Sequence, residues 1–190
     1  MSSSLLRSLN ALGVLGIAVI LATGLALQVI DDELPCPLCL LQRVGFTLVM
    51  FGFMLNVMQG LRARHYGIVV FAALFGAAVA LRQISLHVVP GTGTYGSPIL
   101  GLHLYTWAFL LFAAVLLAVG VLMIASRDHP VDDRAVASGA QRAVCWFAIA
   151  VTAANVIATF LDCGPTVCAD NPVDYILISQ NDLPDLTSFS

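Results

Sequence analysis

Five long apolar stretches constrain the fold of this chain more than any other feature. They lie at approximately residues 9–30, 44–61, 66–86, 104–125 and 143–161. Each is long enough, or nearly so, for a helix to cross a hydrocarbon layer about 30 Å thick. Only 10% of the 190 residues are charged, against roughly a quarter in soluble domains. The pattern predicts an all-α membrane protein with five transmembrane helices.

The charged residues divide between the two ends of these helices. The chain has no lysine, and under the five-helix count most arginines fall on one side: Arg7, Arg62, Arg64, Arg127, Arg134 and Arg142. The opposite side is acidic and contains four of the five cysteines. Because cytoplasmic segments carry an excess of basic residues, we expect the N-terminus in the cytoplasm. The C-terminus and the four cysteines then face a compartment where disulfides persist.

The loops are short, so helices that follow one another should pack antiparallel within one membrane domain, residues 1–190. We interpret the first apolar stretch as a retained helix, because it is too long for a typical signal peptide. The external loop at about 87–103 is rich in glycine, proline and threonine and contains no cysteine. After the fifth helix, residues 162–190 form an external tail.

Cys36 and Cys39 form a C-x-x-C at the outer start of the second helix. This spacing alone fits a redox pair, half of a zinc site or a structural bridge. The unpaired N–H groups of a helix start favour a thiolate at Cys39. Arg43 lies one turn deeper on the same face and would stabilise that thiolate or an anion on an acceptor, although it could instead extend to lipid headgroups. An arginine on the acidic side favours the functional interpretation.

Cys163 and Cys168 form a C-x4-C beside Gly164-Pro165, close enough for a disulfide within the loop. The pair is either a structural staple of the tail or a second redox pair that exchanges with Cys36 and Cys39. A zinc site built from all four cysteines has formally acceptable spacing. The oxidising compartment and the nearby arginine argue against it, so we expect no metal.

A pocket at the outer end of the bundle would be bordered by polar residues near the third and fourth helices. Arg82 and Gln83 follow the third apolar run, and His87 and His103 flank the loop after it. Arginine, glutamine and histidine can donate hydrogen bonds to the ring carbonyls of a quinone. Each histidine is also explained by a location at the membrane interface.

These residues resemble those of the bacterial disulfide bond formation protein B family, DsbB. Cys36-Pro37-Leu38-Cys39 with Arg43 is similar to the C-x-x-C-x-x-x-R motif of that family, which is the most specific match. The segments Arg82–Leu86 and Gly101–Trp107 resemble family segments beside the third and fourth helices. The resemblance covers roughly residues 9–125 and implies an antiparallel four-helix bundle, to which residues 143–161 add a fifth helix.

The resemblance also implies an activity, an oxidoreductase of the bacterial inner membrane that acts on protein thiols with quinone as acceptor. By analogy Cys39 contacts quinone, Arg43 polarises that site, and Cys36 exchanges with the second disulfide. Electrons would pass from a periplasmic DsbA-like thioredoxin-fold protein to the second pair, then to Cys36 and Cys39, and then to the membrane pool of ubiquinone or menaquinone. We expect no nucleic-acid partner.

One departure from the family pattern is the location of the second cysteine pair. Family members usually carry it in the loop between the third and fourth helices, so we expect that Cys163 and Cys168 take its place here. Two other functions stay open. The chain could be a non-catalytic scaffold or accessory subunit of a larger complex, or a reductase of the vitamin K epoxide type. The C-x-x-C-x-x-x-R motif after the first helix argues against the reductase.

Overall fold

The computed structural model describes residues 2–30, 34–88, 98–126 and 137–165, with Cys168, Tyr175 and Leu177. The helices of this part of the chain are α1 (Ser3–Ile30), α2 (Pro37–Gln59), α3 (Ala63–His87), α4 (Leu104–Ser126) and α5 (Gly139–Cys163). All five are long and apolar enough to cross a membrane. The predicted all-α membrane bundle with a fifth helix is therefore confirmed.

The helix α2 begins before its apolar stretch, which starts near residue 44, and so contains Cys39 as the sequence indicated. The helix begins at Pro37, with Cys36 as its N-cap residue. Proline at the first helical position needs no backbone N–H donor, and its fixed φ suits a helix start. Gln42 and Arg43 lie just before the apolar stretch but within the helix. Cys39 and Arg43 thus lie within α2, where their side chains are held by helical geometry.

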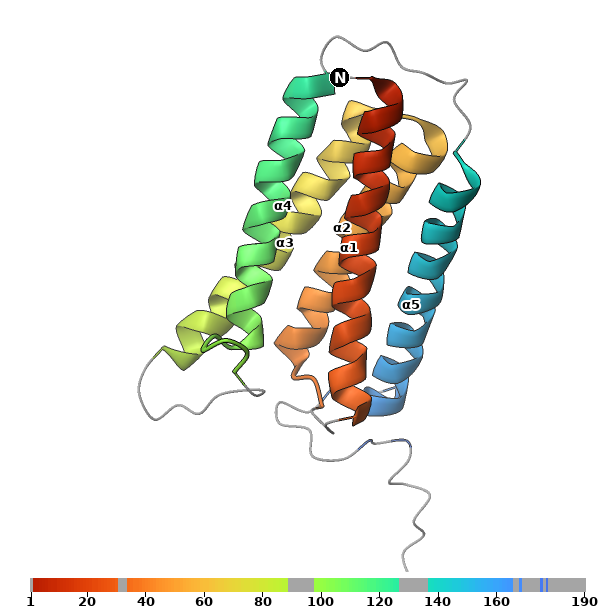
Figure 1. Cartoon of the computed structure of the whole chain (residues 1–190). Coiled ribbons are helices and arrows are strands. Elements are labelled where there is room, and N and C mark those ends of the chain that lie inside the picture. Colours follow the sequence, from red (N-terminus) through yellow and green to blue (C-terminus); the bar gives the residue numbers. More distant parts are fainter. Residues whose placement is uncertain are drawn as a thin grey trace, which may run out of the picture.

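The helices run antiparallel along the chain, and α5 lies on the outside of the bundle (Figure 1). α2 packs against both α1 and α3, and α3 packs against α4. α5 packs mainly on α1, on the side away from α4 (Figure 1). The C-terminal ends of α1, α3 and α5 and the N-terminal ends of α2 and α4 meet at one end of the bundle (Figure 1).

Close packing among α2, α3 and α4 depends on small residues. The ring of Phe112 on α4 stacks on Phe46 of α2, with 4.0 Å between ring centroids. The Phe112 ring also covers Gly76 of α3 so closely that a side chain at Gly76 would overlap it. Helices in a membrane associate through such close contacts, because lipid gives no hydrophobic drive toward burial.

A buried polar network joins α1, α2 and α3 at the opposite end of the bundle from Cys36 and Cys39. Asn10 Nδ2 donates to Tyr66 Oη at 2.8 Å, and Asn56 Nδ2 donates to Asn10 Oδ1 at 3.0 Å. Asn56 Oδ1 accepts from the backbone N–H of Arg62 and lies 3.1 Å from His65 Nδ1. Satisfied hydrogen bonds of this kind fix the register of three helices that apolar contacts alone would specify less sharply.

Candidate functional site

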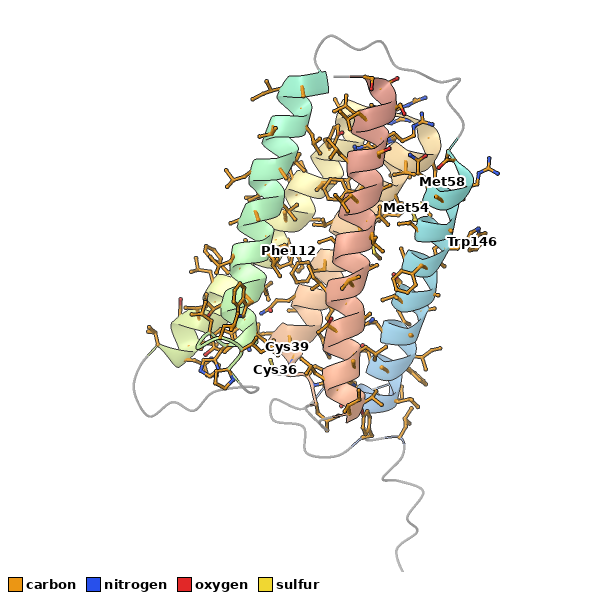
Figure 2. The ribbon with its side chains drawn as sticks, in the orientation of Figure 1. Cys36, Cys39, Met54, Met58, Phe112 and Trp146 are labelled. Atoms are coloured by element: carbon orange, nitrogen blue, oxygen red, sulfur yellow. A yellow bond between two sulfur atoms is a disulfide. The ribbon has the colours of Figure 1, made fainter. Side chains whose placement is uncertain are left out.

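The two cysteines of the C-x-x-C motif lie at the end of the bundle where α2 begins (Figure 2). The sulfur of Cys36 caps α2 by accepting a hydrogen bond from the backbone N–H of Cys39 at 3.2 Å. Cys36 is buried, Cys39 is half-buried, and both are free thiols in the structure. The side-chain hydrogen bond with Cys39, together with burial, raises the pKa of the Cys36 thiol. The two thiols thus differ in their surroundings, and Cys36 is the more deeply buried of the two.

Gln83 of α3 connects the two sulfurs. Its Nε2 lies 3.3 Å from Cys36 Sγ and 3.5 Å from Cys39 Sγ, and it donates to both. Its Oε1 accepts a hydrogen bond from Gln42 Nε2 at 2.7 Å. Both glutamine side chains are buried. The amide of Gln83 is thus fixed in orientation, with its donor group toward the cysteines.

Arg43 extends from α2 across to α1 and α5. Its guanidinium donates to the backbone oxygen of Gly24 at 2.9 Å and to Gln28 Oε1 at 2.7 Å, both on α1. It also donates to Asn155 Oδ1 on α5 at 3.4 Å. The guanidinium is therefore bound inside the bundle and does not extend to lipid headgroups. A helical backbone can approach it closely at Gly24, which has no side chain.

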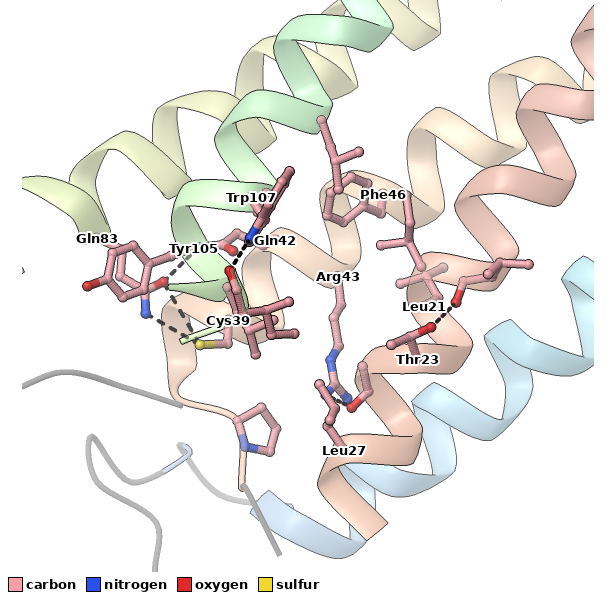
Figure 3. A pocket seen from close by; sticks show the side chains of 18 of the residues that line it. Leu21, Thr23, Leu27, Cys39, Gln42, Arg43, Phe46, Gln83, Tyr105 and Trp107 are labelled. Carbon is pink, nitrogen blue, oxygen red and sulfur yellow. Dashed lines mark hydrogen bonds between the residues drawn. The ribbon is translucent and has the colours of Figure 1, made fainter. Parts of the chain in front are cut away.

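A cavity of about 410 Å³ lies beside Cys39 and Arg43, between α1, α2 and α4. Its walls are mostly apolar, with Leu21 and Leu27 from α1 and Ala108 from α4. Polar atoms come from Cys39, Gln42, Arg43 and Gln83; Figure 3 shows Cys39 and Gln83 together and Arg43 beside α1. Cavities of this size and composition bind small, largely apolar ligands.

The structure brings only some of the predicted site residues to this cavity. Cys39, Arg43 and Gln83 line it, whereas Arg82 is exposed on α3 and does not. His87 lies one turn beyond Gln83, with Nδ1 2.8 Å from the Gln83 backbone oxygen. His87 and His103 lie on Tyr105, with centroid separations of 5.5 and 5.3 Å. The histidine rings are outside the cavity lining, and a role for them or for Arg82 in ligand binding stays a prediction.

Cys163 and Cys168 form a disulfide. Cys163 is the last residue of α5 and is buried, and Gly164 is the C-cap residue, whose N–H donates to the Phe160 oxygen. The φ of Gly164 is +59°, a positive value that glycine adopts without steric cost. The disulfide lies at the same end of the bundle as Cys36 and Cys39, because that end contains both the end of α5 and the start of α2 (Figure 1). In the described part of the chain, no cluster of three or more metal-binding side chains is present.

Several polar residues of the site were not selected from the sequence. Gln28 and Asn155 bind Arg43, Gln42 orients Gln83, and Asp162 is 2% exposed near the end of α5. Each lies within or at the end of an apolar stretch. A polar residue inside a membrane helix is costly unless it has hydrogen-bonding or charged partners. The presence of such residues in apolar stretches was therefore the sequence signal that could have identified them.

The fold and site define a multi-pass helical membrane protein with a cysteine pair next to an apolar cavity. A family model described as "Disulfide bond formation protein DsbB" matches residues 6–94. Disulfide bond formation protein B 1 of Pseudomonas syringae pv. syringae (strain B728a) is 30% identical over 157 residues, which are 65% of this chain and 92% of that protein. The chain belongs to the disulfide bond formation protein B family.

Two other relatives align with a smaller share of the chain. Disulfide bond formation protein B of Stutzerimonas stutzeri (strain A1501) is 39% identical over 90 residues, covering 44% of this chain and 54% of that protein. The protein of the same name from Nitrosomonas eutropha (strain DSM 101675 / C91 / Nm57) is 37% identical over 73 residues, covering 36% of this chain and 45% of that protein. The chain thus spans about half the length of these two relatives. No solved structure matches.

Proposed function

We propose that the protein is a quinone-dependent thiol:disulfide oxidase of the bacterial inner membrane. It reoxidises a periplasmic DsbA-like thioredoxin-fold protein and passes the electrons to ubiquinone or menaquinone. The observation that carries the proposal is the location of Cys39, which lines a mostly apolar cavity together with Arg43. A redox thiol and a cation beside an apolar cavity suit electron transfer to a lipid-soluble acceptor. The family membership supports the same activity.

The cavity fits a quinone in both shape and chemistry. A quinone ring needs apolar walls and donors for its carbonyl oxygens, and it carries no strong donor in the oxidised state. The volume of about 410 Å³ and the apolar lining meet the first need, and the N–H groups of Gln42 and Arg43 meet the second. These two residues and Gln83 would hold the ring. A bound quinone would accept the two electrons and two protons that the cysteine pair loses on forming its disulfide.

Two exchange steps would precede that transfer. The dithiol of the partner protein is oxidised to a disulfide while the Cys163–Cys168 disulfide is reduced to two thiols. These thiols are then reoxidised by exchange with a Cys36–Cys39 disulfide, which leaves Cys36 and Cys39 as thiols. Each exchange moves two electrons and conserves the number of disulfides. Gln83 contacts both Cys36 and Cys39. It would orient their two sulfurs once the pair is in its dithiol form, before the electrons pass to quinone.

The orientation of the chain is part of the proposal. With the N-terminus in the cytoplasm, the end of the bundle that contains both cysteine pairs faces the periplasm. There the Cys163–Cys168 disulfide can meet a soluble partner, while the cavity beside Cys39 is bordered by membrane helices. A thiol-reactive probe that does not cross the inner membrane, added to intact cells, should label a cysteine placed in the tail after residue 178 and not one placed before α1.

The test is dithiol oxidation by the purified full-length protein in detergent with a ubiquinone or menaquinone analogue. We expect one quinone reduced for each disulfide formed, and loss of turnover in Cys39→Ser. Cys145→Ala is the matched control, because Cys145 is a buried thiol on α5 outside the cavity beside Cys39. Undiminished turnover in Cys39→Ser would contradict the proposal.

The shuttle role of the second pair needs a separate measurement. The Cys163→Ser/Cys168→Ser variant should fail to oxidise a reduced thioredoxin-fold partner while still consuming a small dithiol such as dithiothreitol. Normal oxidation of the partner by this variant would show that the Cys163–Cys168 disulfide of the native protein is a structural staple and not a shuttle. Permanently oxidised pairs and no quinone reduction in the native protein would instead favour a non-catalytic scaffold.

A further inference from the structure

A tight turn, residues 99–102, lies just before α4. The N–H of Ile99 donates to the Leu102 oxygen at 2.9 Å, and the N–H of Leu102 donates to the Ile99 oxygen at 3.1 Å. Leu100 and Gly101, the two central residues, have φ values of +52° and +80°. Positive φ at both central positions is characteristic of a type I′ turn. Two hydrogen bonds therefore close the turn and give it a defined shape.

Trp107 binds this turn to the start of α4. Its Nε1 donates to the Ile99 oxygen at 3.0 Å (Figure 3). The same oxygen accepts from the N–H of Leu102, so the indole joins the hydrogen bonds that close the turn. Trp107 lies on the first turn of α4, which begins at Leu104. The helix thereby fixes the position of Ile99.

Ile99 and Trp107 both line the cavity beside Cys39. Leu34 and Pro35, which come shortly before α2, line it as well. α2 and α4 both begin at the end of the bundle that contains Cys39 (Figure 1). The residues that precede these two helices therefore border the cavity toward that end of the bundle, and their side chains are apolar.

The cavity reaches the surface of the bundle on another side. Val19 and Thr23 also line it, and both are exposed residues of α1. They lie within a helix that is long and apolar enough to cross a membrane, so their exposed side faces lipid. A molecule dissolved in the bilayer meets the cavity there, whereas a molecule in water meets Ile99 and Trp107 first.

We propose that Ile99 and Trp107 close the cavity toward water, so that Cys39 is oxidised from the membrane and not by water-soluble molecules. The inference rests on the proposed function in taking a lipid-soluble quinone as the oxidant. The Ile99 side chain supplies the apolar cover, and the Trp107 indole holds that cover in place. A charged molecule would have to leave water to pass this border, which is costly. The two residues thus determine which class of oxidant reaches the cysteine pair.

The test compares two reagents that modify Cys39 in the purified full-length protein in lipid nanodiscs. One is uncharged methyl methanethiosulfonate, and the other is its anionic sulfonatoethyl analogue. A Cys36→Ser/Cys145→Ala background leaves Cys39 as the free thiol, because Cys163 and Cys168 are joined in a disulfide. Serine at position 36 retains a side-chain acceptor for the N-cap of α2. The ratio of the anionic to the uncharged rate measures access, because a change in thiol reactivity affects both rates.

Trp107→Phe keeps an aromatic wall and removes the donor to Ile99. We expect the rate ratio to rise about tenfold, because the turn loses the hydrogen bond that holds it on α4. Ile99→Ala removes most of the cover without removing that hydrogen bond, and the ratio should rise by a similar factor. Trp146→Phe is the matched control, because Trp146 lies on α5 outside the lining of this cavity. Its ratio should equal that of the background.

Two substitutions at Leu100 test the turn itself. Leu100→Pro fixes φ at about −65°, which this turn excludes, and it should raise the ratio as Trp107→Phe does. Asparagine tolerates a left-handed φ better than leucine does. The Leu100 side chain is 87% exposed and is not part of the cavity lining, so Leu100→Asn should leave the ratio unchanged.

The proposal is overturned if the background protein reacts equally fast with both reagents, or if Trp107→Phe and Ile99→Ala have the same ratio as Trp146→Phe. A proportional rise of both rates reports a loosened bundle, and it also overturns the proposal. The measurement requires neither quinone nor a partner protein. A failure of the dithiol oxidation assay would therefore contradict the proposed function and leave the closure of the cavity intact, and the reverse also holds.

Discussion

Gln83 Nε2 donates to Cys36 Sγ at 3.3 Å, which links the end of α3 to the residue that caps α2. The same nitrogen reaches Cys39 Sγ at 3.5 Å. One buried amide therefore contacts both members of the cysteine pair. Since Gln42 holds the oxygen of that amide, the donor group cannot turn away without breaking another hydrogen bond.

Removing this amide should slow dithiol oxidation without unfolding the protein. Gln83→Leu keeps the side-chain volume but removes the donor to both sulfurs. A lost hydrogen bond of about 1 to 1.5 kcal/mol corresponds to a rate loss of roughly tenfold. The measurement is the steady-state rate with a small dithiol and a quinone analogue. Ser85→Ala on the same helix is the control, because its hydroxyl bonds only the Leu81 oxygen, and equal rates in the two variants would contradict the prediction.

The guanidinium of Arg43 should not be replaceable by an ammonium. Its Nη1 donates to Gln28 and Asn155 and its Nη2 donates to Gly24, and the single nitrogen of lysine cannot occupy both positions. We expect Arg43→Lys to lose about tenfold in kcat/KM for the quinone analogue, and Arg43→Met about a hundredfold, from the loss of charge-assisted hydrogen bonds. Arg142→Gln, at the start of α5, controls for the loss of an arginine. Full activity of Arg43→Met would show that the arginine has no role in binding the quinone analogue.

Gly24 offers a way to fill the cavity from α1. A methyl group there would lie 3.6 Å from Arg43 Nη2, an ordinary van der Waals distance, so Gly24→Ala should retain activity. Gly24→Leu places a larger side chain against the guanidinium and into the cavity wall. We expect its KM for the quinone analogue to rise at least about tenfold, the equivalent of about 1.4 kcal/mol of lost binding. An unchanged KM would show that the ligand binds elsewhere.

Two glycines of α3 should respond in opposite directions to alanine. A Cβ at Gly76 would overlap the Phe112 ring, so Gly76→Ala should destabilise the bundle by about 1 to 3 kcal/mol. At Gly67 nothing lies within 4 Å of the added atom, so Gly67→Ala should be neutral or stabilising by up to about 1 kcal/mol, from helix propensity. The thermal unfolding midpoint in detergent measures both. Equal midpoints would show that the contact between α3 and α4 is looser than the structure indicates.

Much of the architecture followed from the sequence because membrane helices obey a simple length rule. An apolar segment of about 20 residues in lipid must satisfy its own backbone hydrogen bonds, and a helix does this locally. The same local geometry placed Cys39 and Arg43 one turn apart on α2. The family resemblance depended on these local features and on the C-x-x-C-x-x-x-R spacing, and the match to residues 6–94 bears it out.

What the sequence could not show was the direction in which polar side chains point between helices. Arg82 and Gln83 were grouped as neighbours, yet Arg82 is exposed and Gln83 is fully buried beside the cysteines. Adjacent residues on a helix point about 100° apart. In a soluble helix the polar face would reveal which one is buried, but these helices are apolar toward both lipid and protein.

The sequence by itself determined the five membrane helices, the pairing of Cys39 with a cation one turn away, and the family. Each of these depends on residues close together in the chain. Only the tertiary structure decided that Arg43 binds Gln28 and Asn155, which are 15 and 112 residues away, and that Gln83 contacts both Cys36 and Cys39. Those contacts depend on how the helices are rotated and packed, and the rotation is set by small residues and buried hydrogen bonds rather than by a division between apolar and polar faces.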